Sequence, residues 1–466
     1  MRQLLLPMEE THRETPTLSY RDKLIKLLSH DLDFHDQDSR YASHNFHSFP
    51  AKFPPQLPRT FITALTEPGD IVLDPMMGSG TTILEALLAE RHGFGFDIDP
   101  LALRITQVKV RPLRMDHLSQ LARTIVVEAR HDCQAKRAAL KAELKEHWND
   151  ETKKFVDYWF DPEIQIELLA IIKKINSLTD ESAKAFFVLA FSAIIITKTG
   201  GISLALDLGH TRPHRAKIVL DRDGGYILGR ELSDDIVNKY RNLTKKLRSP
   251  LDEFERRVQQ NLKGVLNPND IKGISCLLTG SAEQMPLRDS TVDLIVTSPP
   301  YASNAIDYMR AHKFALVWLG YVLGELSEKR KKYIGGEATT DAELEDMPSY
   351  VAGIIDKVSQ RDRNRGRVLH RYYSEMKKVL GEMFRVLKPN KSAIVVVGSS
   401  VMREIDTETG ICLAEIGRGI GFDIAKIGVR RLDRDRRMLP AGTRRNLQSQ
   451  IQQRMHEEYV IGFYKP

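Results

Sequence analysis

One short stretch restricts the fold of this 466-residue chain more than any other. The apolar, β-branched run Val292–Val296 is typical of a buried parallel strand, and Thr297-Ser298-Pro299-Pro300-Tyr301 follows it directly. Two adjacent prolines end a strand, because neither has an N–H for the ladder and each fixes its own φ. The chain must therefore leave as a stiff loop at the strand's carboxyl end, the edge of an open α/β sheet where ligands bind.

The atoms of this loop suit a planar ring that carries an amino group. Residues before a proline are held extended, so the carbonyls of Ser298 and Pro299 point in fixed directions. Ser298 adds a hydroxyl acceptor, and Tyr301 adds an aromatic face. Acceptors that hold both N–H hydrogens out of the ring plane restore the lone pair of an aromatic amine. We therefore expect attack by an exocyclic amine, although the loop alone also fits an ordinary strand-ending turn.

A glycine-rich stretch earlier in the chain predicts a second ligand loop. The strand-like Gly69–Leu73 leads into Asp74-Pro75-Met76-Met77-Gly78-Ser79-Gly80-Thr81-Thr82, and a helical pattern over 83–90 follows. Gly78 and Gly80 let the backbone approach a ligand, while Thr81 or Thr82 can cap a helix whose N–H groups face it. No lysine follows the glycines, and the spacing matches neither a phosphate loop nor a dinucleotide fingerprint.

Taken together, the two loops resemble those of amino-methylating DNA methyltransferases. Residues 297–301 look like the Ser-Pro-Pro-Tyr catalytic form, which in that family goes mostly with cytosine N4 methylation. Asp-Pro-Pro-Tyr and Asn-Pro-Pro-Tyr forms lean towards adenine N6. Residues 74–82 resemble the S-adenosyl-L-methionine loop Asp-Pro-Phe-x-Gly-Ser-Gly-Thr-Thr, with Met76 in place of the usual Phe. The resemblance covers roughly 44–110 and 270–466 and implies an α/β, Rossmann-like methyltransferase sheet, mostly parallel, with helices on both faces.

The resemblance also implies which residues hold the cofactor and the target base. Asp97, at the end of a second expected strand, would accept the ribose hydroxyls, and Ile98 would pack on the adenine. Asp99, before Pro100, is expected to cap the next helix. In the family, an Asp at the position of Ser281 often contacts the adenine amine. Here that contact is either lost or made by Glu283. The expected cofactor residues are Phe53, Asp74, Pro75, Met76, Gly78, Ser79, Gly80, Thr81, Asp97, Ile98, Ser281 and Ala282. The expected catalytic residues are Ser298, Pro299, Pro300 and Tyr301.

Four segments follow from this reading. We expect an N-terminal extension over 1–43, a methyltransferase core with the cofactor loop over 44–110, a largely helical insertion over 111–268, and a core with the catalytic loop and basic segments over 269–466. Within the insertion the composition predicts helices over 117–147, 161–199 and 230–263. The insertion either helps to grip DNA or is a solvated appendage.

Basic residues gather in the last segment. The net charge of +7 and a pI of about 9.0 are compatible with a polyanionic partner. Arginine-rich stretches at 361–367 and 430–445 suggest contacts with DNA phosphates. Asn304 and Asp307 either touch the target base or cap the following helix. The expected DNA-binding residues are Arg361, Arg363, Arg365, Arg367, Arg430 and Arg431.

The expected substrate is cytosine flipped out of double-stranded DNA, with adenine N6 the first alternative. RNA or protein methylation, or a DNA-binding protein without turnover, fit less well, and whether a cognate restriction or defence component exists is not readable. Cys133, Cys276 and Cys412 lack disulfide or metal-ligand spacing, which suits the cytoplasm, and we expect no metal. None of them follows a proline, which argues against carbon-5 cytosine chemistry. The longest uncharged apolar run, 185–197, falls short of the ~20 residues that cross a bilayer, so we expect no membrane association.

Overall fold

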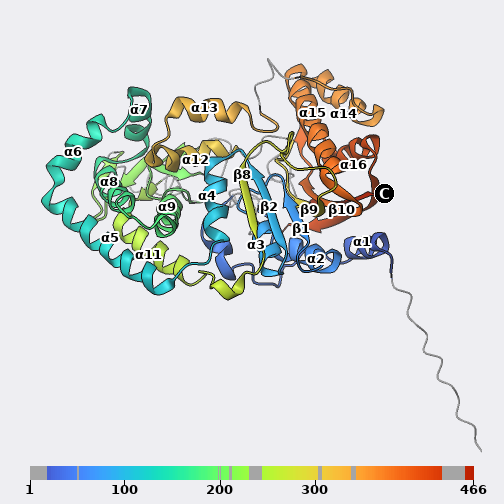
Figure 1. The fold of residues 1–466 in the computed structure, drawn as a ribbon. Coiled ribbons are helices and arrows are strands. Elements are labelled where there is room, and N and C mark those ends of the chain that lie inside the picture. The colour runs from blue at the N-terminus through green and yellow to red at the C-terminus, as the bar shows by residue number, and fades with distance from the viewer. Residues whose placement is uncertain are drawn as a thin grey trace, which may run out of the picture.

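The computed structural model describes residues 18–49, 52–197, 199, 201–208, 213–229, 244–302, 307–336, 343–432 and 457–466. These residues build a central sheet of seven strands in the order β13-β14-β10-β9-β1-β2-β8 (Figure 1). Strand β14 runs antiparallel to both of its neighbours, and every other pairing in the sheet is parallel. The strands are β1 (Ile71–Asp74), β2 (His92–Asp97), β8 (Ser275–Thr279), β9 (Val292–Thr297), β10 (Leu387–Gly398), β13 (Asp423–Arg431) and β14 (Glu457–Lys465).

This topology confirms the predicted Rossmann-like methyltransferase sheet. Numbered along the chain, the strands lie in the order 3-2-1-4-5-7-6 from β8 to β13. The order therefore reverses between β1 and β9, which pair in parallel with Val72 opposite Leu294 and Leu73 opposite Ile295. Ligands of open α/β sheets bind at the carboxyl ends of the strands that flank such a switch point. The two predicted loops leave β1 and β9 at this point.

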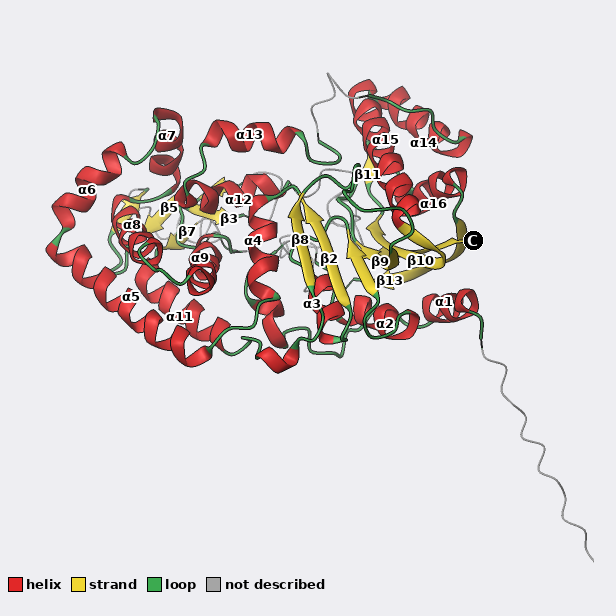
Figure 2. Cartoon of the chain, viewed as in Figure 1, coloured by secondary structure: helices red, strands yellow, loops and turns green. Residues whose placement is uncertain are grey.

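Helices cover both faces of the sheet (Figure 2). Side chains alternate along each strand, so Val72 and Val296 face one layer while Leu73 and Ile295 face the other. The first layer holds α1 (Tyr20–Ser29) and α2 (Gln56–Leu65). The second layer holds α14 (Ser349–Arg361), α15 (Arg363–Val386) and α16 (Thr409–Ile420). The remaining core elements are α3 (Thr81–Leu88), α4 (Pro100–Lys109), α12 (Tyr308–Leu316), α13 (Leu323–Lys331), the 3-10 turns η1 (Ala42–Asn45), η3 (Pro268–Asp270) and η4 (Val317–Leu319), and the hairpin strands β11 (Val401–Met402) and β12 (Ile405–Asp406).

The insertion enters between β2 and β8 and forms a helical lobe on the side of the sheet away from α14 to α16 (Figure 1). The ring of Phe46 packs edge-on against Phe186 at 6.0 Å, and Phe160 lies 6.1 Å from Phe314 of α12. Because its core is continuous with core helices, the insertion is not a solvated appendage. Its helices are α5 (Met115–Ala135), α6 (Arg137–Glu146), α7 (Asp150–Trp159), α8 (Pro162–Asn176), α9 (Glu181–Ile195) and α11 (Pro250–Leu262). Its strands are β3 (Ala205–Asp207), β4 (His214–Arg215), β5 (Ile218–Leu220), β6 (Tyr226–Leu228) and β7 (Thr244–Lys246).

Two helix predictions in the insertion need correction. The helix expected over 117–147 breaks at Lys136, whose ψ of 24° leaves the helical range, and so forms α5 and α6. Of the helix expected over 230–263, residues 230–243 lie outside the described part, 244–246 form a strand, and α11 accounts for the rest. The two helices expected over 161–199 are confirmed as α8 and α9. None of the described helices is both long and apolar enough to cross a membrane.

Candidate active site

Hydrogen bonds join the two predicted loops where they leave the sheet. Thr297 Oγ1 donates to Asp74 Oδ1 at 2.7 Å, and the same oxygen accepts from the Met76 N–H at 3.2 Å. Thr82 Oγ1, at the start of α3, donates to the Val296 carbonyl at 3.0 Å. Asp74 is only 2% exposed, and burial raises its pKa to about 6 against the opposing effect of these hydrogen bonds. Asp74 thus ties the predicted cofactor loop to the predicted catalytic loop.

The cofactor loop needs glycine at two positions. Gly78 and Gly80 have φ of +48° and +69°, in the left-handed region that favours glycine. A Cβ on Gly80 would lie 2.4 Å from Thr106 Cγ2, and one on Gly78 would lie 3.0 Å from Phe49 Cε1. Helix α3 begins at Thr81 directly after the loop, and its N-cap is Gly80 without a side-chain hydrogen bond, so the expected capping by Thr81 or Thr82 is wrong. The conformation of the loop and its packing against Phe49 and Thr106 therefore both require glycine at these positions.

A buried polar cluster supports this loop from behind. Lys109 is 1% exposed and donates from Nζ to the Ser79 carbonyl at 2.6 Å. Burial holds the pKa of Lys109 far below its usual value. Nearby, Glu85 Oε1 accepts from the Tyr41 hydroxyl at 2.8 Å and lies 2.7 Å from His44 Nε2. Burial raises the pKa of Glu85 to about 7. Sequence reasoning missed this cluster, because its members lie in three separate segments and form no local pattern.

Asp97 lies at the end of β2, against the cofactor loop. Its Oδ2 accepts from the Gly78 N–H and its Oδ1 from the Asp99 N–H, both at 2.8 Å. Burial, and then the neighbouring Asp99, raise the pKa of Asp97 to about 7. A carboxylate offers about four lone-pair sites, so each oxygen of Asp97 can still accept one hydrogen bond from a hydroxyl. This capacity fits the two ribose hydroxyls predicted for Asp97, with the half-buried Ile98 next to it.

Asp99 caps α4, as predicted. Its Oδ1 accepts from the N–H groups of Leu101 at 2.8 Å and Ala102 at 3.2 Å. Its Oδ2 lies 2.6 Å from His312 Nδ1 and accepts from the Tyr333 hydroxyl at 2.8 Å. Burial would raise the pKa of Asp99, but attraction to His312 and these hydrogen bonds outweigh it, and the pKa lies below its usual value. Asp99 therefore anchors α12 beside the cofactor loop.

An aromatic wall that the sequence reading missed closes this side of the site. The Phe49 ring stacks on Tyr308 with centroids 5.2 Å apart and lies 5.4 Å from His312. Phe49 also covers Gly78. The predicted Phe53, by contrast, is 6% exposed and belongs to the apolar cluster beneath α2. Each phenylalanine precedes a proline, so the local signal alone did not separate them.

The turn after β8 reaches the same edge of the sheet. The Gly280 N–H donates to the Asp97 carbonyl at 3.2 Å, which places the exposed Ser281 and the buried Ala282 next to this strand end. Met76 packs on the apolar cluster that contains Ala282, so its thioether side chain occupies an apolar position. The other predicted cofactor residues lie within the loop itself: Pro75, Gly78, Ser79, Gly80 and Thr81.

The catalytic loop ends in a tyrosine that is fixed by a buried ion pair. Tyr301 is 9% exposed and donates its hydroxyl to Glu458 Oε1 at 2.7 Å. Glu458 in turn pairs with Arg430, its partner across β13 and β14. Burial, and then Glu458, hold the pKa of Tyr301 well above its usual value, so the hydroxyl stays a donor. In the loop, Pro299 is buried, and Ser298 and Pro300 are half-buried.

This ion pair corrects one prediction for DNA contact. Arg430 is 4% exposed and committed to Glu458, so its guanidinium does not face a phosphate. Arg431, the next residue on β13, is exposed. Asp307 caps α12 by accepting from the Arg310 N–H, while Asn304 and 433–445 lie outside the described residues.

The other predicted arginines surround the junction of α14 and α15. Arg361 is half-exposed and pairs with Glu404. Arg363 and Arg367 are exposed, whereas Arg365 is half-buried. Arg363 and Arg365 lie in the first turn of α15, where cations oppose the helix dipole, so helix formation does not explain these two arginines.

Comparisons with known proteins match this chain to DNA methyltransferases. The family described as DNA methylase matches residues 8–108, which include the cofactor loop and Asp97. The Type II methyltransferase M.MvaI of Kocuria varians is 24% identical over 430 residues, covering 85% of this chain and 86% of the relative. The Type II methyltransferase M.BsoBI of Geobacillus stearothermophilus is 22% identical over 415 residues, covering 77% and 74%. A solved rRNA methyltransferase from Streptomyces viridochromogenes aligns at 11% identity with a TM-score of 0.26, covering 90% of this chain and 88% of that one, a score too low to support any argument.

Proposed function

Because the chain belongs to the amino-group DNA methyltransferases, enzymes that use S-adenosylmethionine, we propose that it methylates the exocyclic N4 amine of cytosine in duplex DNA. The hydrogen bond from Thr297 to Asp74 carries this proposal, since it fixes the Ser-Pro-Pro-Tyr loop against the glycine loop at the switch point of the sheet. The Type II relatives extend the proposal to a restriction-modification system, with an endonuclease of the same specificity as the cognate component.

The residues of the glycine loop and its neighbours would hold the cofactor. Asp97 would accept the ribose hydroxyls, Ile98 and Ala282 would line the adenine, and the loop backbone at Gly78 and Gly80 would pass close beneath it. When bound, S-adenosylmethionine supplies an electrophilic methyl group. The protein's part is positioning, which can remove ~7–11 kcal/mol of a barrier when the reacting groups are well aligned.

The catalytic loop would orient the amine. The Ser298 hydroxyl and the carbonyls of Ser298 and Pro299 would accept the amine hydrogens and direct its lone pair at the methyl group. Tyr301 would stack on the base, and the Glu458 hydrogen bond keeps its ring in one place. The base must first leave the duplex, at a cost of a few kcal/mol. The exposed Arg363 and Arg367, near the start of α15, would contact phosphates.

The choice of cytosine rests on the Ser298 form of the loop. A serine hydroxyl can also accept from the N6 amine of adenine, which keeps adenine as the second candidate. The test is incubation with methyl-labelled S-adenosylmethionine and mixed-sequence duplex DNA, followed by digestion to nucleosides and mass spectrometry. We expect label in N4-methylcytosine. Label in N6-methyladenine would overturn the choice of base, and label in RNA controls alone would overturn DNA as the substrate.

A further inference from the structure

Helix α4 holds two successive carbonyl groups of the glycine loop, residues 74–82. Lys109 Nζ donates to the Ser79 carbonyl at 2.6 Å, and Thr106 Oγ1 donates to the Gly78 carbonyl at 3.2 Å. Thr106 and Lys109 lie three residues apart on α4, so both side chains extend from the same face of the helix. They are 0% and 1% exposed. One buried face of α4 therefore fixes the loop from the side.

The peptide between Ser79 and Gly80 has both of its polar groups engaged. Its carbonyl accepts from Lys109, and its N–H donates to the Met77 carbonyl at 2.7 Å. Met77 belongs to the loop itself, whereas Lys109 lies 30 residues beyond Ser79. Among the described residues, Lys109 therefore supplies the one hydrogen bond that ties this peptide to the rest of the fold.

A lysine is an unfavourable residue to bury at this position. A polar group loses free energy on burial unless a partner replaces its water, and burial holds the pKa of Lys109 far below its usual value, although Glu85 opposes this effect. In the described chain no carboxylate lies within ion-pair distance of Lys109, and the Ser79 carbonyl is the one hydrogen-bond acceptor of its Nζ. An apolar side chain of the same length would avoid the cost of burial. What the lysine adds here is its hydrogen bond to the loop.

We propose that Lys109 is a positioning residue for the cofactor, which holds the glycine loop in the shape that cofactor binding requires. This inference rests on the proposed function, in which the loop backbone at Gly78 and Gly80 passes beneath the cofactor. Lys109 acts through the Ser79 carbonyl and is not a catalytic residue. Thr106 has the same role at the Gly78 carbonyl.

Loss of the Lys109 amine should weaken cofactor binding rather than slow the chemical step. Ser79 is 5% exposed, so without its donor the carbonyl stays buried and unsatisfied, or the loop shifts to shapes in which it finds another partner. Binding must then restore the original shape, and the affinity falls with the fraction of molecules that hold it. Once the cofactor is bound the loop is back in place, so kcat at saturating cofactor should keep its wild-type value.

The experiment compares the wild type with Lys109→Met, which keeps the length of the side chain and removes the donor. Calorimetry measures the affinity for S-adenosylmethionine, and methyl transfer to duplex DNA gives kcat and the KM for the cofactor. Urea unfolding gives the stability of each variant. If Lys109→Met does not fold, Thr106→Val takes its place with the same expected result, because it removes the other donor and keeps the shape of the side chain.

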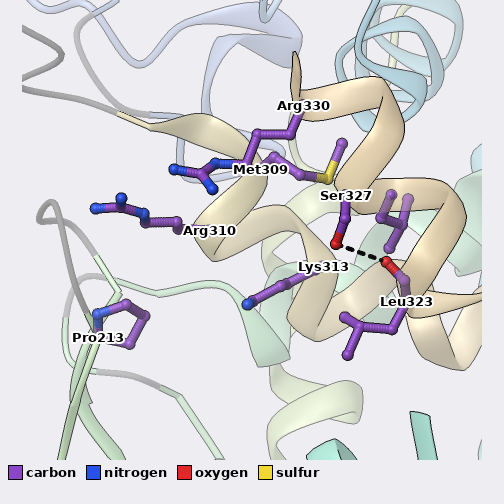
Figure 3. Close-up of a pocket in the computed structure, with 8 residues that line it drawn as sticks. Pro213, Met309, Arg310, Lys313, Leu323, Ser327 and Arg330 are labelled. Carbon is purple, nitrogen blue, oxygen red and sulfur yellow. Dashed lines mark hydrogen bonds between the residues drawn. The ribbon is translucent and has the colours of Figure 1, made fainter. Parts of the chain in front are cut away.

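Two other lysines provide matched controls. Lys245 is a half-buried lysine of the insertion whose Nζ donates to the carbonyls of Thr199 and Ala205, so Lys245→Met loses comparable hydrogen bonds in another part of the fold. Lys313, on α12, lines the cavity between α12, α13 and Pro213 (Figure 3). Lys313→Met removes one positive charge and no hydrogen bond to the loop, so it controls for the effect of charge on a cationic cofactor.

We expect Lys109→Met to weaken cofactor affinity and to raise the KM for the cofactor about tenfold, the effect of one lost buried hydrogen bond, with kcat unchanged. Lys245→Met and Lys313→Met should keep the wild-type affinity. If Lys109→Met binds the cofactor as tightly as Lys245→Met, or lowers kcat alone, the inference is overturned, and methylation of DNA by the wild type leaves the proposed function standing.

The proposed function can also fail by itself. A wild type that binds the cofactor but does not methylate DNA would overturn the proposed function, and calorimetry on Lys109→Met would still decide whether this lysine positions the loop. A wild type that binds no cofactor would overturn both proposals.

Discussion

The substitution Glu458→Ala tests whether a buried ion pair fixes Tyr301, the tyrosine of the proposed catalytic loop. Arg430, Glu458 and Tyr301 are 4%, 6% and 9% exposed, so removal of the carboxylate leaves a buried guanidinium without its counter-charge. Breaking such a pair costs roughly 3–5 kcal/mol. The Tyr301 hydroxyl also loses its acceptor, which costs about 1–3 kcal/mol when a buried donor stays unsatisfied. We expect the free energy of unfolding to fall by at least ~3 kcal/mol, a large part of the total stability of a typical domain.

Urea unfolding, followed by circular dichroism, measures this loss. The double variant Glu458→Ala with Arg430→Met should regain part of it, because no uncompensated charge stays buried. Arg21→Ala is the matched control: Arg21 pairs with Asp423 on β13, but these side chains are 41% and 45% exposed, so a much smaller change is expected. If Glu458→Ala destabilises the protein no more than Arg21→Ala, the ion pair does not hold Tyr301 in place.

Two further predictions concern the cofactor loop. Gly80→Ala should lower the free energy of unfolding by more than ~2 kcal/mol and weaken cofactor binding about tenfold or more. The left-handed backbone alone costs an alanine ~1–2 kcal/mol, and the added Cβ would also lie 2.4 Å from Thr106. Gly69→Ala is the control, because Gly69 has φ +88° but no atom within 4 Å of an added Cβ, so only the backbone cost applies. If both variants lose the same free energy of unfolding, the clash with Thr106 does not matter. In the protein without cofactor, the pKa of Asp97 is about 7, so its side chain is protonated below that pH. The ribose hydroxyls, by contrast, bind the carboxylate form. Cofactor affinity measured by calorimetry should therefore fall as the pH drops below about 7 and level off above it, and Asp97→Asn should show weak binding with a flat profile.

The sheet and both loops were predictable because their signals are local. A β-branched run that stops at two prolines, and two glycines between a strand and a helix, allow few backbone paths. The capping role of Asp99 was equally local, as Pro100 follows it.

The remaining features depend on contacts between distant parts of the chain. Arg430 lies in an arginine-rich stretch, and only the pairing of β13 with β14 places it opposite Glu458 and out of solvent. The choice between Phe49 and Phe53 likewise depends on where the chain passes over Gly78. Lys136 interrupts a helix whose composition continues unchanged, because α6 turns to pack on α8. Such features come from tertiary packing, which local residue patterns do not reveal.

Single-turnover methyl transfer by Tyr301→Ala, with cofactor affinity measured in parallel, tests the central claim most directly. In the proposed mechanism the target base lies on the Tyr301 ring and the cofactor on the glycine loop. We therefore expect a loss of about 10²-fold or more in the rate of transfer to duplex DNA, with cofactor affinity unchanged. A variant that transfers methyl groups at the wild-type rate would show that the Ser-Pro-Pro-Tyr loop is not where the reaction occurs.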